Sequence, residues 1–511
     1  MVALILIGIG FYGLSRVPTG FLPIEDQGYL IAAVQLPDGA ALDRTQKVLD
    51  RVSEITGKTP GVEQVITIAG ISALDNSASL ANAGVAYIIL KDWGSRGPGE
   101  DLRSLVYGLN DKLAPILEAR ALVLPPPPIQ GIGNAAGFAM QIELRDGNSD
   151  YAKLQAITQA MVANAQTQSA LQRVQSPFRA TVPQFDVEID RVKTQTLHVT
   201  TDEVFSALAS YTGSSFVNQF NKFGRVFQVY AQADAQFRLT PRDIANMMVR
   251  NQNGDMIPIG TLAKITPAVG PSLISLYNLY PSSTIVGLPA QGYSSGQSLN
   301  LLEQIADKTL PPGTGYEWTA MSYQEKAVSS QIYYVFGLAM LLVYLVLAGQ
   351  YESWYAPISV ILAVPLSLLG PMSVLRGLGI DNNLYVQIGL ILLIALSAKN
   401  AILIVEVGLE LHVCDGKPVL ESAIEAARAR FRPILMTSFA FILGVVPLVL
   451  ATGAGASARK SIGITVFSGM LASTCLAVLF VPAFFVVVQR FENWRAEKKA
   501  PAAPSVSKAA P

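Results

Sequence analysis

The sequence predicts an α-helical membrane bundle joined to an α+β domain outside the membrane. Hydrophobic residues make up 51% of the 511 residues and charged residues only 14%, whereas soluble domains carry about 25% charged residues. The apolar segments lie at the two ends of the chain. The long polar region between them, about 15–328, alternates strand and helix patterns.

The composition argues against several other classes of protein. Lysine plus arginine and aspartate plus glutamate both total 37, so no net positive charge indicates a nucleic-acid partner. His198 and His412 are the two histidines, and neither belongs to a cluster with metal-ligand spacing. Cys414 and Cys475 lie near or inside apolar segments, so the polar region contains no disulfide. Because no nucleophile–base pair or phosphate-binding loop is present, we expect no enzymatic activity, metal site or cofactor.

The region 329–490 predicts a transmembrane bundle of about five helices with short loops. Each of its apolar segments is long enough to cross a bilayer: 331–349, 354–375, 384–411, 433–452 and 461–489. Residues 1–14 are apolar but shorter than a span, and they lack the basic start and cleavage site of a signal peptide. We expect them to be the end of a transmembrane helix that begins outside this sequence.

The basic residues predict the orientation of the bundle. One group lies between the third and fourth spans and the other follows the fifth: Lys417, Arg428, Arg430 and Arg432, then Arg490, Arg495, Lys498 and Lys499. Both groups fall on one side of the membrane, which the positive-inside rule makes cytoplasmic. The polar region 15–328 then lies on the opposite side. The tail 491–511 is cytoplasmic and ends in a low-complexity run, for which we expect disorder.

The polar region predicts two split β-α-β units. Residues 29–136 give the order β-α-β-β-α-β, with strands at 30–36, 62–70, 84–90 and 121–124. This order is typical of a ferredoxin-like unit. A second unit is divided between 137–180 and 273–320. The intervening 181–272 is rich in strand and turn signals and predicts an inserted subdomain.

Lys399 is a charged residue within an apolar stretch, LSAKNAILIVE (396–406). It lies about fifteen residues into its span, near the bilayer middle at about 1.5 Å rise per residue, which is too deep for snorkelling. Charges at this depth usually mark an ion or proton pathway, although a buried structural ion pair is an alternative. Asn400 adds a polar neighbour, whereas Glu406 is two turns away, about 10 Å along the axis and too far for a direct ion pair.

The other four predicted spans contain no aspartate or glutamate that could pair with Lys399. They do contain hydroxyl groups, at Thr437, Ser438, Ser468, Ser473 and Thr474. A threonine within a span more often bonds to its own helix than relays a proton, so Thr437 is weak evidence. Arg430, at the cytoplasmic end of the fourth span, is more often a topological anchor.

A cleft between the two β-α-β units is the candidate binding region. Its candidate lining residues are Ile66, Ile71, Tyr87, Phe138 and Met140. Their alternation along strands more often indicates packing in a sheet core.

Several motifs resemble the resistance-nodulation-division family, and most closely its hydrophobe/amphiphile efflux branch. LSAKNAILIVE and RFRPILMTSFAFILGVVPLVLATGAGA (430–456) carry the resemblance in the membrane region. Further matches are GFLPIEDQG (20–28), VYAQADAQFR (229–238), MSYQE (321–325) and YESW (351–354). The resemblance covers nearly the whole chain, but only the second half of the family's usual length.

The resemblance implies the C-terminal half of a proton-driven pump in the bacterial inner membrane. Such a pump exports amphiphilic small molecules (drugs, detergents, dyes) through a tripartite complex. It is a homotrimer with a large periplasmic domain, and its partners are a periplasmic adaptor protein and an outer-membrane channel. The proton motive force drives it, without a cofactor. The two β-α-β units would be porter subdomains, and 181–272 the docking subdomain.

The resemblance also assigns roles to individual residues. Lys399 becomes the lysine of a proton relay, with Asn400 beside it, Thr437 as its hydroxyl neighbour and Arg430 in the same pathway. The relay aspartates would lie in the missing N-terminal half. In the drug pocket, Ile66, Ile71 and Ala73 stand where aromatic residues are common, Tyr87 keeps one, and Phe138 and Met140 lie on a strand near its entrance.

Two alternatives to a drug exporter remain. One is a transporter of the same architecture for another cargo, such as a metal or a lipid. A methionine path would favour metal, but Met140, Met247 and Met248 are scattered. The other is a non-transporting fragment or assembly module, because the relay aspartates are missing.

Overall fold

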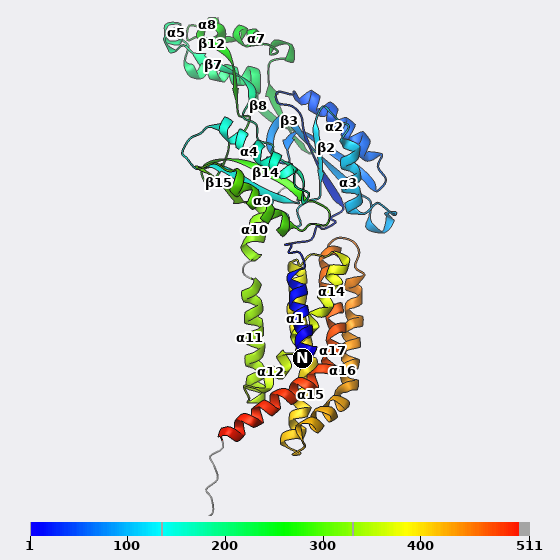
Figure 1. Ribbon diagram of the computed structural model, residues 1–511. Helices are drawn as coiled ribbons and strands as arrows, with labels where there is room; N and C mark the ends of the chain where they lie inside the picture. Colours follow the sequence, from blue (N-terminus) through cyan, green and yellow to red (C-terminus); the bar gives the residue numbers. More distant parts are fainter. Residues whose placement is uncertain (1, 134–135, 330–331, 500–511) are drawn as a thin grey trace, which may run out of the picture. The chain divides into compact units, whose positions relative to one another are not determined.

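The computed structural model describes residues 2–133, 136–329 and 332–499 (Figure 1). The predicted disorder of the C-terminal tail therefore falls mostly outside the described residues. The chain forms two compact units. Unit 1 comprises Met1–Asn148, Ala156–Pro177 and Leu276–Pro511, and unit 2 comprises Ser149–Gln155 and Phe178–Ser275.

The first sheet of unit 1 is antiparallel and has the strand order β2-β3-β1-β4. Its strands are β1 (Tyr29–Gln35), β2 (Val62–Ser72), β3 (Ala78–Leu90) and β4 (Arg120–Leu124), with α2 (Leu42–Gly57) and α3 (Leu102–Leu113) between them. Val48, Leu49 and Val52 recur along one side of α2, which buries that side in the core. The β-α-β-β-α-β element order expected over 29–136 is present in these strands and helices.

The second sheet joins strands that are far apart in the sequence. Its order is β13-β14-β5-β15, with β6 also on β14. The strands are β5 (Phe138–Leu144), β6 (Leu171–Gln175), β13 (Ser275–Tyr277), β14 (Tyr280–Pro289) and β15 (Thr314–Trp318). The accompanying helices are α4 (Tyr151–Gln166), α9 (Ser295–Thr309) and α10 (Ala320–Ser329).

Unit 2 contains three two-stranded ladders. They pair β7 (Val182–Ile189) with β12 (Ala263–Gly270), β8 (Ser215–Lys222) with β9 (Arg225–Ala231), and β10 (Met248–Arg250) with β11 (Met256–Pro258). Four short α-helices accompany them: α5 (Arg191–Thr196), α6 (Thr201–Leu208), α7 (Pro241–Asn246) and α8 (Ile259–Leu262). Val204, Ile259 and Leu262 form the centre of a small core. The subdomain boundaries expected from the sequence remain predictions.

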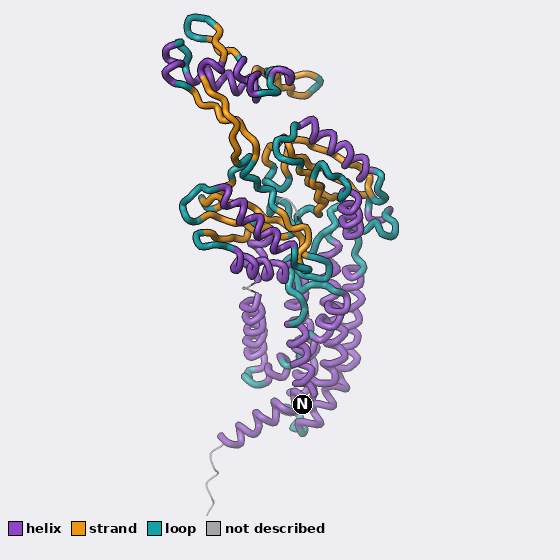
Figure 2. The backbone as a smooth tube through the Cα atoms, turned by 45° about the horizontal axis from the view of Figure 1, so that its top comes forward, coloured by secondary structure: helices purple, strands orange, loops and turns teal. Residues whose placement is uncertain are grey.

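Long helices form the membrane bundle of unit 1 (Figures 1 and 2). They are α1 (Val2–Ser15), α11 (Ile332–Tyr351), α12 (Ala356–Ile361), α13 (Val364–Ser367), α14 (Leu369–Leu378), α15 (Leu384–Val413), α16 (Val419–Val449) and α17 (Ala456–Lys499). Within the described residues, four stretches are long and apolar enough to span a membrane, or five if the bent α17 counts as one span. The predicted segments coincide with these stretches.

Glycines allow the membrane helices to approach one another closely. A Cβ atom at Gly370 of α14 would overlap the carbonyl oxygen of Ser468 on α17. A Cβ atom at Gly389 of α15 would lie 3.0 Å from the Cβ of Thr465, also on α17. Small residues of this kind let helix backbones pack closely in membranes, where van der Waals contact drives association. Helix α17 is therefore held tightly against both α14 and α15.

Replacing Gly370 with alanine is expected to destabilise the bundle. The added methyl group meets backbone that cannot move aside, and such overpacking typically costs about 1–3 kcal/mol. Thermal unfolding of the purified protein should show a lower Tm for Gly370→Ala. Gly444→Ala is the matched control, because nothing lies within 4 Å of its added Cβ. Equal Tm values for the two variants would contradict the close contact between α14 and α17.

Candidate functional site

Lys399 lies on a face of α15 that the described residues leave open. The exposed residues on this helix include Ile388, Leu392, Ala395, Lys399 and Glu406. Their spacing of three, four and seven positions places them along one side of the helix. The other sides of α15 pack against α16 and α17. The lysine therefore projects from the side of α15 that has no helix of this chain packed over it.

No residue in the described part of the chain forms an ion pair or hydrogen bond with Lys399. The same holds for ion pairs to Arg430, whose Nε–H is buried without a hydrogen-bond partner among those residues. A buried donor without a partner costs roughly 1–3 kcal/mol, and more when it is charged. Both cations thus fit a site that is completed by groups outside the described residues.

A buried polar layer crosses the bundle beside Lys399. The Asn400 side-chain amide donates to the hydroxyl of Ser438 on α16 at 3.5 Å, and the Ser473 hydroxyl on α17 donates to that of Ser397 on α15 at 3.1 Å. All four side chains are buried. Hydrogen bonds between helices satisfy such groups where water is absent. The layer links α15 to both of its neighbours.

Thr437 does not contact this layer in the structure. Its hydroxyl donates to the carbonyl of Ile434 on its own helix at 3.1 Å, and the residue is exposed. This is the bond to its own helix that threonines within spans commonly make. The structure instead brings the adjacent Ser438 to Asn400. Sequence reasoning counted Ser438 among the available hydroxyls without giving it a role.

Ile66, Ile71, Ala73 and Tyr87 lie along one part of the first sheet. Ile66 on β2 is opposite Tyr87 on β3, and it is 46% exposed. Tyr87 is half-buried, with its ring tilted against that of Tyr29. Ile71 is near the end of β2, and Ala73 follows in the turn. Ile66 and Tyr87 alternate with residues that pack against the α2 and α3 core, so they belong to the opposite, partly open face.

Phe138 and Met140 are core residues of the second sheet. Both are buried, and Met140 is paired with Ile285 on one side and Trp318 on the other. The ring of Phe138 occupies the space over Gly287, where a Cβ atom would overlap it. Their alternation therefore reflects packing within the sheet, and they share no open surface with Ile66 in this conformation.

A further cavity of about 540 Å³ lies in unit 1 and is mostly apolar. Helices α1, α10, α11, α13 and α15 and residues 17–21 contribute to it. Apolar clefts of this size with a few polar groups are typical ligand sites. None of the substrate residues predicted from the sequence lines it. Glu325, within the motif MSYQE, is its acidic lining residue, and the sequence alone gave no indication that this carboxylate is buried.

Two carboxyl groups outside the spans have raised pKa values. Burial raises the pKa of Glu325 to about 7, although the Ser295 hydroxyl donates to it at 2.8 Å and Lys326 is nearby. Burial also raises the pKa of Asp381 to about 6, against the opposing charge of Arg103. Asp381 itself adds to the shift at Glu325. Glu325 is therefore partly protonated near neutral pH.

The features on α15, α16 and α17 define a multispanning membrane protein with a polar centre and strand-rich soluble regions. Residues 1–489 match the AcrB/AcrD/AcrF family, and the chain belongs to this family. This confirms the resemblance to the resistance-nodulation-division transporters that the motifs indicated.

Individual relatives are transporters by name. The chain is 40% identical over 478 residues to the Multidrug export protein AcrF of Escherichia coli (strain K12), which covers 93% of this chain and 46% of that protein. It is 40% identical over 488 residues to the Toluene efflux pump membrane transporter TtgB of Pseudomonas putida, covering 95% and 46%. It is 39% identical over 494 residues to the Multidrug resistance protein MdtF of Escherichia coli (strain K12), covering 96% and 47%. The chain spans about half the length of these relatives.

The raised pKa of Glu325 predicts a pH-dependent stability. The pKa rises from 4.5 to about 7 in the folded state, so the folded protein binds this proton more tightly than the unfolded chain does. The stabilisation is full below about pH 4.5 and is lost as the pH rises through about 7. The Tm of the purified protein should therefore fall over this interval.

Glu325→Gln should make the dependence of Tm on pH shallower, with the part due to Asp381 remaining. Glu63→Gln serves as the control, because Glu63 is exposed on β2. A Glu325→Gln protein with the same pH dependence as wild type would show that this carboxyl is not buried.

Proposed function

We propose that the chain is the C-terminal half of a proton-driven exporter of amphiphilic small molecules in the bacterial inner membrane. The observation that carries the proposal is Lys399, a cation on an open face of α15 without a partner among the described residues. Membership of the AcrB/AcrD/AcrF family supports it, as do the names of the multidrug and solvent efflux relatives.

In the proposed mechanism, a carboxylate from the other half of the transporter faces Lys399. The two groups attract each other while the carboxylate is charged, and protonation cancels this attraction. The helices would then favour a different arrangement, so proton binding shifts the population between two conformations. Arg430, with its unpartnered Nε–H, would complete the same pathway. Asn400 and Ser438 would hold α15 and α16 in register during the change.

The proposed substrates are amphiphiles, and two regions would receive them. One is the partly open face of the first sheet with Ile66, Ile71, Ala73 and Tyr87. The other is the 540 Å³ cavity that includes Glu325. Both are apolar, and the first is poor in aromatic residues.

The proposed assembly follows from the family. Residues 29–136, and 137–180 with 273–320, would be periplasmic porter subdomains, and 181–272 a docking subdomain. A homotrimer would work with a periplasmic adaptor protein and an outer-membrane channel. The hairpin of β8 and β9 supports the docking role, because it exposes apolar side chains such as Phe216, Phe220, Phe223 and Phe227.

Substitution of Lys399 tests the proposed proton relay. The chain is expressed from its native locus with whatever coding sequence precedes it, and efflux of a hydrophobic cationic dye from cells is measured. Lys399→Ala should reduce efflux to the level of cells that lack the gene. Lys399→Arg should also be inactive, because arginine keeps its charge and has a different shape.

Lys460→Ala provides the control, since this lysine is exposed at the start of α17. It should leave efflux and membrane insertion unchanged. Dye efflux that persists in Lys399→Ala would refute the relay. No efflux by the wild-type protein would instead favour another cargo or a non-transporting assembly module.

A further inference from the structure

Residues 16–28, here called the connecting segment, run from the end of α1 to the start of the first sheet. Part of this segment pairs through its backbone with the loop that precedes α15. Asn382 N–H donates to Pro18 at 2.8 Å, and Leu384 N–H donates to Phe21 at 2.9 Å. Thr19 and Asn382 form a parallel bridge in the same place. The segment is thus fixed to the beginning of the helix that carries Lys399.

Glu25, in the same segment, binds the beginning of α17. Its carboxylate accepts hydrogen bonds from the backbone N–H groups of Ser457 at 3.2 Å and Ala458 at 2.6 Å. Only 8% of the residue is exposed. The first N–H groups of a helix lack partners within the helix, and a carboxylate there also interacts favourably with the helix dipole. Glu25 therefore supplies the contact of the segment with α17.

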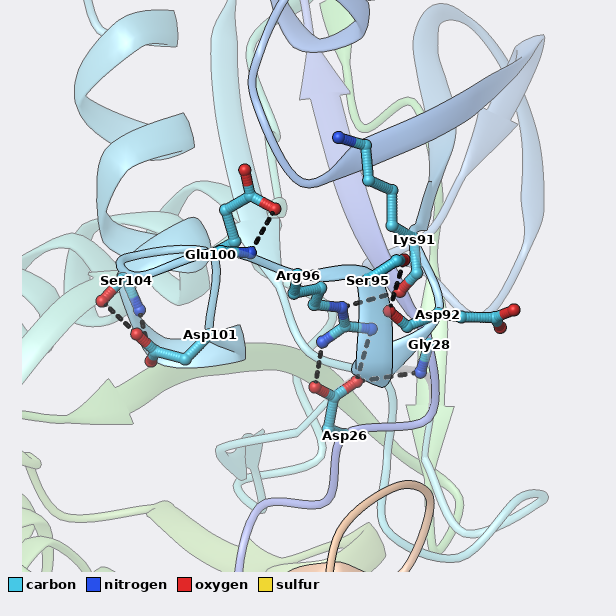
Figure 3. A network of polar contacts seen from close by, with 10 residues as sticks. Asp26, Gly28, Lys91, Asp92, Ser95, Arg96, Glu100, Asp101 and Ser104 are labelled. Carbon is cyan, nitrogen blue, oxygen red and sulfur yellow. Dashed lines mark hydrogen bonds and ion pairs between the residues drawn. The ribbon is translucent and has the colours of Figure 1, made fainter.

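The next residue, Asp26, faces the first sheet and its loops. It forms a two-pronged ion pair with Arg96, and it also accepts the N–H of Gly28 at 3.0 Å (Figure 3). Arg96 donates in turn to the carbonyl of Lys91 at 2.7 Å, directly after β3. The Arg96 side chain is 6% exposed, and charge-assisted bonds shielded from water hold their geometry well. Adjacent carboxylates thus attach the segment to α17 on one side and to the first sheet on the other.

Helices α15 and α17 are themselves tightly joined. Gly389 packs against Thr465 near the beginning of both helices, and the hydroxyls of Ser397 and Ser473 are bonded deeper in the bundle. A displacement of α15 that follows a change at Lys399 would therefore displace α17 as well. Close-packed interfaces of this kind transmit strain because they cannot deform continuously.

We propose that the connecting segment carries movement of α15 and α17 to the first sheet, and that Glu25 is the positioning residue at its contact with α17. This inference rests on the proposed transport function. Glu25 does not touch the proton pathway or the substrate. It acts by keeping the beginning of α17 attached to the segment, so that a shift in the bundle changes the position of Asp26 and, through Arg96, of β3.

The charge balance at Glu25 agrees with a contact held under opposing forces. Burial raises the pKa of its carboxyl, and Asp26 acts in the same direction. The two backbone N–H groups and Arg459 lower the pKa. The carboxylate is thus held away from water by its bonds to α17, and removing it leaves those N–H groups unpaired.

The test compares Glu25→Ala and Glu25→Gln in dye efflux, with the full protein expressed from its native locus. If Glu25 couples movement, Glu25→Ala should lower the maximal efflux rate about ten-fold and change the apparent KM less than about two-fold. Glu25→Gln keeps one acceptor oxygen for α17, so it should recover part of the rate. Glu118→Ala is the control, because Glu118 pairs with Arg51 at an exposed site.

The possible outcomes separate the two proposals. An unchanged maximal rate in Glu25→Ala overturns the coupling role of Glu25. So does a Glu25→Ala protein that fails to accumulate beside a Glu25→Gln protein with the wild-type rate, since the residue would then serve folding alone. An inactive wild-type protein refutes the transport function itself.

Discussion

The arrangement of this membrane bundle depends on one charge, the ammonium group of Lys399, placed deep in an apolar helix. A charge at this depth is costly unless a partner or water compensates it. The helices of this chain cover the other sides of α15 and leave the side with Lys399 open. The polar layer of Ser397, Asn400, Ser438 and Ser473 is satisfied internally, so it does not neutralise the lysine. The charge therefore defines a face of the bundle that another element must complete.

The same bundle provides a physical route from that charge to the soluble region. Glycines and hydroxyls join α15 to α17, and the connecting segment binds the beginnings of both helices. Its two neighbouring carboxylates, Glu25 and Asp26, have opposite attachments. The route consists of short hydrogen bonds and close packing, and no step needs a long flexible element. A proton-dependent change in the bundle can in this way reach the first sheet.

Features set by local pattern could be predicted from the sequence. The apolar segments predicted the membrane helices, because a span needs a fixed length of apolar residues. Alternation and helical periodicity predicted the elements of the first sheet. Lys399 was recognisable because its charge contradicts its surroundings. The family could also be predicted, because its motifs lie in these segments.

Features that depend on distant contacts could not be predicted. Glu25 lies in a loop, and its partners on α17 are more than 400 positions away in the chain. Burial of Glu325 depends on helices that come together only in the fold. The exposed Thr437 and the bonded Ser438 are adjacent in the sequence, and only the rotation of α16 distinguishes them. Phe138 and Met140 alternate as pocket residues would, yet the pairing of β5 with β14 and β15 buries them.

Photo-cross-linking from Ala395 tests the central claim most directly. Ala395 lies one turn from Lys399 on the open face of α15. A photoreactive amino acid placed there, in the protein expressed from its native locus, reports what covers this face. We predict a cross-link to a helix with an aspartate or glutamate within about one turn of the labelled position. Adducts with lipid alone would contradict the account, because Lys399 would then face the bilayer without a partner.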